Sequence, residues 1–98
     1  MSKPLPFGSL FAVAGVSMDG RQEVAGRLNV DDVLHFVCVD DNEFDQFAVE
    51  IRTSSGEMLG FVPKALTERV RAHGAPVLDG VVCAVLDSYE TTGLRVAV

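Results

Sequence analysis

The sequence DDNEFDQFAVEI, at residues 40–51, predicts an acidic loop that runs directly into a β-strand. Its first half consists of Asp, Asn, Glu and one Phe, and the side chains of Asp and Asn stabilise turns by bonding back to the nearby backbone. In its second half, apolar residues recur at every second position, which places Phe47, Val49 and Ile51 on one face. A period of two is typical of a half-buried strand. We therefore expect this strand to form a hairpin with a strand on either side.

Further segments on both sides of this stretch also carry strand signals. The six predicted strands cover residues 10–16, 33–39, 47–52, 58–62, 77–86 and 89–98. The first two are apolar on both faces. We expect the first to be central in the sheet, and runs such as the second are typical of closed barrels or sandwiches. In the turn between the third and fourth strands, Gly56 is free to take a positive φ. Asp79 and Gly80 predict a bulge near the start of the fifth strand.

Residues 63–73 carry the clearest helix signal in the chain. Pro63 stands where a helix would begin and Gly74 where it would end, which is the usual asymmetry of helix ends. One apolar stripe recurs at every fourth position, at Val62, Leu66 and Val70. The basic residues off this stripe are expected to form a solvated face: Lys64, Arg69, Arg71 and His73. A weaker pattern at 21–28 predicts a short helix or an irregular crossover.

These signals together predict a mainly β protein. Short strands, turn signals roughly every 8–12 residues and a helix between the fourth and fifth strands favour a small OB-like six-stranded β-barrel. The barrel would carry one clear helix at about 63–73 and a second, short one at about 21–28. With 98 residues, we expect a single domain at 9–98 that follows a lead-in at 1–8.

The charge of the chain restricts its partners. The net charge is −6, and seven acidic residues but no Lys or Arg lie between Asp31 and Glu50. This argues against a protein that binds long duplex nucleic acid, which needs a basic face, but it is compatible with a small site that grips a strand end. Cys38 and Cys83 each lie in an apolar run, which fits buried reduced thiols and a cytoplasmic protein. No apolar run reaches the ~20 residues of a membrane span.

The acidic loop does not have the residues of a metal site. Asp41, Glu43 and Asp45 have the spacing that opens a calcium loop. However, Gln46 stands at the sixth position, where that loop needs Gly, and Arg52 stands at the twelfth, where it needs a bidentate Glu. We therefore expect no metal ion and no cofactor.

Catalysis is not expected either. The two histidines, His35 and His73, stand apart from each other and from the cysteines, and His35 is interpreted as a residue of the barrel rim or of the packed sheet. No nucleophile has a recognisable base beside it, and no glycine-rich loop could cradle a phosphate. The sequence thus predicts a binding module and not an enzyme.

Three sequence blocks resemble the HIRAN domain family. They are Gly15 and Val16 in the first strand, residues 42–49, which match the pattern N-x-[YF]-D-x-x-A-[VI], and residues 60–63 at the end of the hairpin. The resemblance spans roughly residues 11–98 and implies a modified OB-like barrel of about six strands with one or two helices. Members of the family are fused to SWI/SNF-type helicases, where they bind the free 3′ end of single-stranded DNA, or occur as small stand-alone bacterial proteins.

The resemblance implies a site for a strand end. Its residues would be Asp41, Asn42, Phe44, Asp45, Phe61 and Lys64. The Asn side chain offers a donor and an acceptor, the aromatic ring at 44 can stack on a base, and Lys64 matches a basic residue that contacts phosphate. Asp45 can accept a hydrogen bond from a terminal hydroxyl but would repel an internal phosphate, so it would select an end.

The chain departs from the family pattern in three places. End-binding members carry a basic residue and an aromatic residue where Phe11 and Ala12 stand, and an Asn where Phe47 stands. Two functional hypotheses follow. In the first, the domain captures a 3′ end of single-stranded DNA during repair or processing, with a helicase or nuclease as a partner protein. In the second, it is a non-enzymatic protein-interaction or assembly domain whose acidic loop faces a basic partner.

Overall fold

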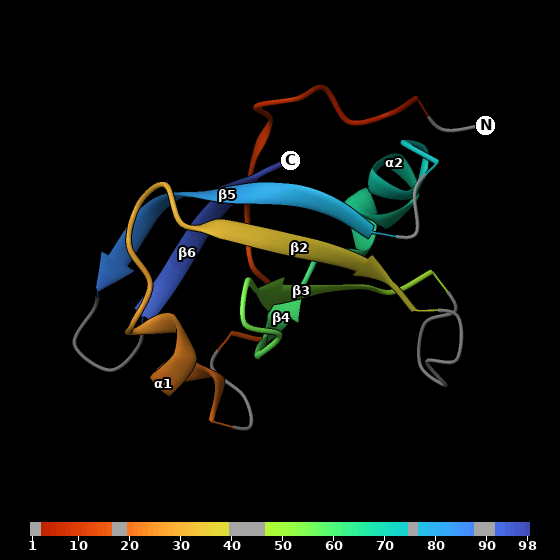
Figure 1. Cartoon of the computed structure of the whole chain (residues 1–98). Helices are drawn as coiled ribbons and strands as arrows, with labels where there is room; N and C mark the ends of the chain where they lie inside the picture. Colours follow the sequence, from red (N-terminus) through yellow and green to blue (C-terminus); the bar gives the residue numbers. More distant parts are fainter. Residues whose placement is uncertain (1–2, 17–19, 40–46, 75–76, 88–91) are drawn as a thin grey trace.

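The computed structural model of the chain describes residues 3–16, 20–39, 47–74, 77–87 and 92–98. In chain order, its elements are β1 (Leu10–Ala12), α1 (Arg21–Ala25), β2 (Val33–Cys38), β3 (Val49–Thr53), β4 (Met58–Phe61), the 3₁₀-helix η1 (Lys64–Leu66), α2 (Thr67–Arg71), β5 (Val77–Asp87) and β6 (Thr92–Ala97) (Figure 1). The prediction of a mainly β chain with six strands is confirmed. No helix among the described residues is long and apolar enough to cross a membrane.

The six strands form one antiparallel sheet in the order β1-β6-β5-β2-β3-β4. The sheet curls into a half-barrel, with α1 below it and α2 at its upper right in Figure 1. The expected small OB-like barrel with a helix between its fourth and fifth strands is therefore confirmed. β2, whose sequence is apolar on both faces, lies between β5 and β3.

The two ends of the curled sheet meet at Ala14 and Phe61. The Ala14 N–H donates to the Phe61 carbonyl at 2.8 Å, and the Phe61 N–H donates to the Ala14 carbonyl at 2.9 Å. Gly60 makes this approach possible, because a Cβ atom there would lie 2.5 Å from both the Ala14 oxygen and Val13 Cγ1. The residue before Phe61 must therefore lack a side chain if the first strand is to reach β4.

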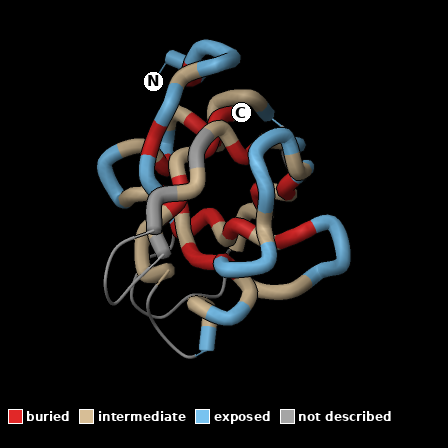
Figure 2. Tube along the Cα trace, turned by 90° about the vertical axis from the view of Figure 1, so that its left-hand side faces the viewer, coloured by how far each residue is buried: buried red, intermediate tan, exposed pale blue. Residues whose placement is uncertain are grey.

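The hydrophobic core fills the inside of this curl. Figure 2 shows the buried residues on the inner parts of the chain and the exposed residues in the outer turns. The largest fully buried side chains come from five strands and are those of Phe36, Leu34, Ile51, Leu59, Leu94, Val49, Val82 and Val96. At β5, a Cβ on Gly80 would collide with the ring of Phe36. Gly80 is thus a point of close packing, and the register shift in β5 lies between Val82 and Ala84, not at the predicted bulge position.

The first strand is shorter and less central than predicted. β1 pairs with β6 only, and Leu10 is 60% exposed. After Ala14, which bridges to β4, Gly15 takes a φ of 72° and ends the extended conformation. The run is apolar on both faces, and this pattern predicted a central strand. In the structure the strand lies at the edge of the sheet and buries one face, and hydropathy alone does not distinguish such an edge strand from a central one.

The third strand begins two residues later than its alternating pattern predicted. Val49, Ile51 and Thr53 are buried and point to the core, as the period of two requires. Phe47 is 43% exposed and Ala48 is buried, which is the reverse of the predicted faces. Both residues precede β3, so the strand alternation does not apply to them.

The helical predictions are correct in place and differ in form. The segment after Pro63 consists of one turn of 3₁₀-helix (η1) and one short α-helix (α2), and Gly74 follows with a φ of 83°. The predicted short helix at 21–28 is α1, which follows Gly20 at a φ of 77°. The hairpin between β3 and β4 has Gly56 at a φ of 90°, as expected.

Candidate nucleic-acid interface

The six predicted site residues fall into two groups. Asp41, Asn42, Phe44 and Asp45 lie outside the described residues. Phe61 and Lys64 are described: Phe61 lies at the point where the sheet ends meet, and Lys64 follows it at the start of η1. The site can therefore be examined from these two residues and from the stems of the acidic loop, at Val39 and Phe47.

Lys64 is an exposed cation at the start of η1. Pro63 precedes it with a φ of −53° and a ψ of 138°, so the chain turns sharply from β4 into the helical segment. The Lys64 carbonyl accepts a hydrogen bond from Thr67 Oγ1 at 3.0 Å, which holds the turn. Its side chain forms no ion pair with a carboxylate among the described residues. An exposed lysine ammonium group of this kind can bind an anionic ligand.

Phe61 is the last residue of β4 and is partly buried. The guanidinium of Arg21 lies over its ring, with Cζ 5.4 Å from the ring centroid. The same guanidinium donates to the Gly15 carbonyl at 2.9 Å, so α1 is tied to both strands that meet at the sheet ends. A cation over a ring face is attracted by the ring quadrupole, so this face of Phe61 is occupied by Arg21.

Arg71, at the end of α2, binds both stems of the acidic loop. Its Nε donates to the Phe47 carbonyl, and its Nη2 donates to the carbonyls of Val39 and Ala48, each at 2.9 Å. The Val39 N–H also donates to the Ala48 carbonyl at 2.9 Å. The prediction of a merely solvated basic face is therefore wrong for Arg71, whose guanidinium joins the end of β2 to the start of β3.

The N-terminal segment supports α2 from the opposite side. Leu5 is buried, and its N–H donates to the Arg69 carbonyl at 3.0 Å. His73 Nε2 lies 2.7 Å from the Leu5 carbonyl oxygen, and the ring of Phe7 lies 4.8 Å from the His73 ring, between centroids. Helix α2 is thus held between the segment around Leu5 and the stems of the loop.

The two positions at which end-binding HIRAN members carry helper residues offer no stacking surface here. Phe11 is buried and packs on Phe36, with ring centroids 5.8 Å apart. Ala12 is exposed and has no ring. Any recognition of a base in this region therefore depends on other residues.

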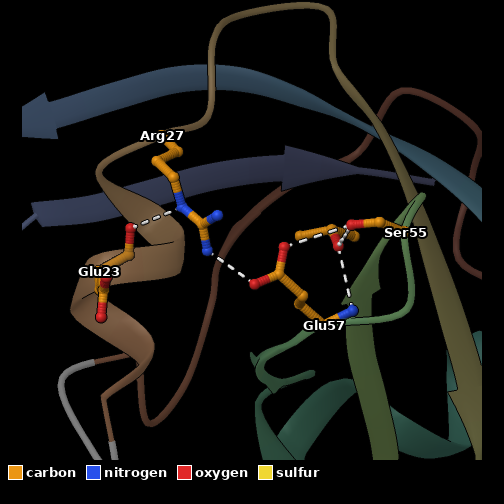
Figure 3. A network of polar contacts seen from close by, with 5 residues as sticks. Glu23, Arg27, Ser55 and Glu57 are labelled. Carbon is orange, nitrogen blue, oxygen red and sulfur yellow. Dashed lines mark hydrogen bonds and ion pairs between the residues drawn. The ribbon is translucent and has the colours of Figure 1, made fainter.

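A separate polar network lies between α1 and the hairpin of β3 and β4 (Figure 3). Arg27 Nη2 donates to Glu57 Oε2 at 2.6 Å, and Arg27 Nε donates to the Glu23 carbonyl at 3.3 Å. Ser55 Oγ donates to Glu57 Oε1 at 3.3 Å. The hydrogen bond from Arg27 is the largest effect and lowers the pKa of Glu57 below its ordinary 4.5. Desolvation opposes it, and the charge of Arg27 and the bond from Ser55 add smaller effects that lower the pKa.

Beside this network lies a shallow, open cleft of about 350 Å³. Its lining residues are Gly20, Arg21, Val24, Glu57 and Met58. Arg21 therefore borders the cleft and covers Phe61 as well.

The histidine of β2 has a partner that the sequence did not indicate. His35 Nδ1 lies 2.9 Å from Asp79 Oδ1, because the two residues are directly opposite in the pairing of β2 with β5. The interpretation of His35 as a residue of the barrel rim or of the packed sheet is consistent with its half-buried state. No group of three or more His, Cys, Asp or Glu side chains that could hold a metal ion occurs within the described part of the chain.

Sequence reasoning missed the roles of Arg21, Arg27 and Arg71. Arg21 and Arg71 donate to main-chain carbonyls, and every residue carries such an acceptor, so no sequence pattern marks these contacts. Arg27 and Glu57 are 30 residues apart, and only the folded hairpin brings them together. Comparison with models of protein families, with curated proteins and with solved structures finds no match.

Proposed function

We propose that this domain is a nucleic-acid-binding module that captures the 3′ end of single-stranded DNA in repair or processing. The proposed groove lies between the acidic loop, with Asp41, Asn42, Phe44 and Asp45, and Lys64. The observation that supports it best is Lys64 itself, an exposed cation without a carboxylate partner among the described residues, on the helical segment that also binds the loop stems through Arg71. The three sequence blocks that resemble HIRAN domains support the same function.

The charge distribution favours capture of an end over binding along a strand. Arg27 and Arg52 are paired with Glu57 and Glu50, and Arg71 is bound to carbonyls, so these cations are engaged within the protein. A net charge of −6 then allows only a few phosphate contacts. We expect the logarithm of the affinity to fall with the logarithm of the salt concentration with a slope of about 0.7 for each phosphate contact, which means a weak dependence on salt.

Each residue of the proposed groove has a defined chemical role. Lys64 would neutralise the phosphate nearest the end, and Phe44 would stack on the terminal base, a contact that contributes about 1–3 kcal/mol. Asn42 would donate and accept hydrogen bonds at a base edge or phosphate. Asp45 would accept a hydrogen bond from the 3′ hydroxyl. Phe61, with its other face covered by Arg21, would form a preformed apolar wall of the groove.

The test is a titration of short labelled single strands that end in a 3′ hydroxyl or a 3′ phosphate. We expect the wild-type protein to prefer the free hydroxyl. Lys64→Ala and Asp45→Ala should each weaken binding on the order of tenfold, which corresponds to about 1.4 kcal/mol. Lys3→Ala removes another exposed lysine, so it is the matched control and should bind as the wild type does. Absence of binding at low salt, or equal binding of both ends, contradicts the proposal.

The acidic loop and an exposed ring beside it favour a second candidate function, a protein-interaction or assembly domain. Phe47, at the exit of the loop, is 43% exposed, and a basic partner with an apolar patch would match this pair of features. In that case the single strands would not bind at low salt, and substitutions in the loop would leave the fold intact. If Asp45→Ala instead lowers the melting temperature sharply and leaves strand binding unchanged, Asp45 caps the loop and does not contact a ligand.

A further inference from the structure

Three main-chain carbonyls surround the guanidinium of Arg71, and they come from both stems of the acidic loop. The carbonyls of Phe47 and Ala48 precede β3, and the carbonyl of Val39 follows β2. The guanidinium is planar and presents its N–H groups in a fixed fork, so it can satisfy several acceptors only when they stand at set positions. The two stems are therefore held at one spacing by a group that belongs to neither strand.

The body to which Arg71 is attached is itself fixed on two sides. Val70, the neighbouring residue of α2, is buried in the core. On the other side, Leu5 donates to the Arg69 carbonyl, and its own carbonyl lies 2.7 Å from His73 Nε2. Because the helix is anchored, its Arg71 side chain holds the bonded stem carbonyls at a fixed place. A side chain on a mobile helix would move with that helix and would not fix the stems.

We propose that Arg71 is a positioning residue that fixes the spacing of the loop stems and thereby sets the affinity for a strand end. Its Nε and Nη2 donate to main-chain carbonyls, and we assign the contact with the phosphate to Lys64. The consequence for affinity depends on the proposed function, but the effect on the stems does not. Loss of the fork would remove three of the contacts that support the Val39–Ala48 backbone bond, so the Val39 amide would open more often.

The experiment compares three variants of the full-length chain by hydrogen exchange and strand binding. Arg71→Ala removes the fork, and Arg71→Lys keeps the charge without its planar geometry. Arg69→Ala is the matched control, because Arg69 is on the same helix and, within the described part of the chain, its Nε donates to the Lys3 carbonyl at 3.4 Å and not to the loop stems. The exchange rate of the Val39 amide is measured by NMR relative to that of an amide in the centre of β2, which corrects for any change in global stability.

We expect Arg71→Ala to raise the relative exchange rate of the Val39 amide at least tenfold, Arg71→Lys to raise it to a smaller extent, and Arg69→Ala to leave it unchanged. The affinity for a strand with a 3′ hydroxyl should fall on the order of tenfold for Arg71→Ala, with no loss for Arg69→Ala. Equal exchange of the Val39 amide in wild type and Arg71→Ala overturns the positioning role. Faster exchange with an unchanged affinity overturns its link to binding.

A wild-type protein that binds no strand would instead refute the proposed function. In that case the exchange rates alone decide whether Arg71 positions the stems, so the two failures are distinguishable. If Arg71→Ala does not fold, Arg71→Lys serves as the test. Wild-type exchange in that variant would show that a positive charge suffices, and it would overturn the role of the planar fork.

Discussion

Substitution of Gly60 by alanine tests how the sheet closes. A Cβ atom at this position would lie 2.5 Å from the Ala14 oxygen and from Val13 Cγ1, and atoms in real proteins do not approach a Cβ so closely. One of these groups is backbone, so the first strand must move away from β4. That movement breaks or lengthens the two hydrogen bonds between Ala14 and Phe61.

The magnitude follows from these two effects. Each backbone hydrogen bond contributes about 0.5–1.5 kcal/mol to stability, and overpacking a well-packed site costs about 1–3 kcal/mol. We therefore expect the free energy of unfolding to fall by about 2–6 kcal/mol, out of the ~5–15 kcal/mol that is usual for a domain. For a chain of this size, the melting temperature should fall by roughly 10 °C or more. Urea and thermal unfolding, followed by circular dichroism, measure both quantities.

Gly26→Ala is the matched control for the same chemical change. Gly26 follows α1 at a φ of −67°, and a Cβ there would lie 3.3 Å from the Gln22 carbonyl oxygen. Alanine adopts this φ and loses less entropy on folding, which offsets the small shift that the tight contact with the Gln22 oxygen requires, so the variant should be within about 1 kcal/mol of the wild type. If Gly60→Ala also unfolds within about 1 kcal/mol of the wild type, the close approach of the first strand to β4 does not hold the barrel closed.

Three further variants test contacts between segments that are distant in the sequence. Leu5→Ala should lower the free energy of unfolding by about 2–4 kcal/mol because Leu5 is buried against α2. Phe7→Ala should change it by less than about 1 kcal/mol because Phe7 is 74% exposed. Equal effects of the two variants in chemical denaturation would contradict the anchoring role of the N-terminal segment. Because the pKa of Glu57 in the folded protein lies below its ordinary 4.5, the stabilisation that it gains is present above pH 4.5 and is lost as the pH falls through the folded pKa. Arg27→Ala should raise this pKa towards 4.5, as followed by NMR titration of the Glu57 carboxyl carbon, and an unchanged titration would show that the pair in Figure 3 does not form in solution.

The sequence predicted the main features of the fold because they depend on local patterns. The alternation through Val49 and Ile51 placed their side chains in the core, and Pro63 and Gly74 marked the limits of the helical segment. The same patterns failed where neighbours in space decide the outcome. The apolar run that starts at Leu10 lies at the edge of the sheet, and only its pairing with β6 reveals this.

The sequence named candidate side chains for the site but not the contacts that support them. Lys64 could be named from the sequence blocks, and its exposure agrees with a role in binding. Arg71 could not be assigned its role, because its partners are carbonyls that no side chain identifies. His35 was expected to stand alone, but its partner Asp79 is 44 residues away on β5. Contacts of this kind arise from the register of the sheet, which hydrophobic periodicity does not specify.

The pairing of β1 with β6 has a consequence for the route by which the chain folds. Leu10 lies opposite Ala97, so these two strands join nearly the whole length of the chain. Closing so long a loop costs conformational entropy before the contacts between the strands can offset that cost. Topologies dominated by distant pairings therefore fold slowly. We therefore expect the meander of β2, β3 and β4 to form early, and β1 to dock last, after β6 has paired with β5. During synthesis, β1 would therefore remain unpaired until β6 has been made.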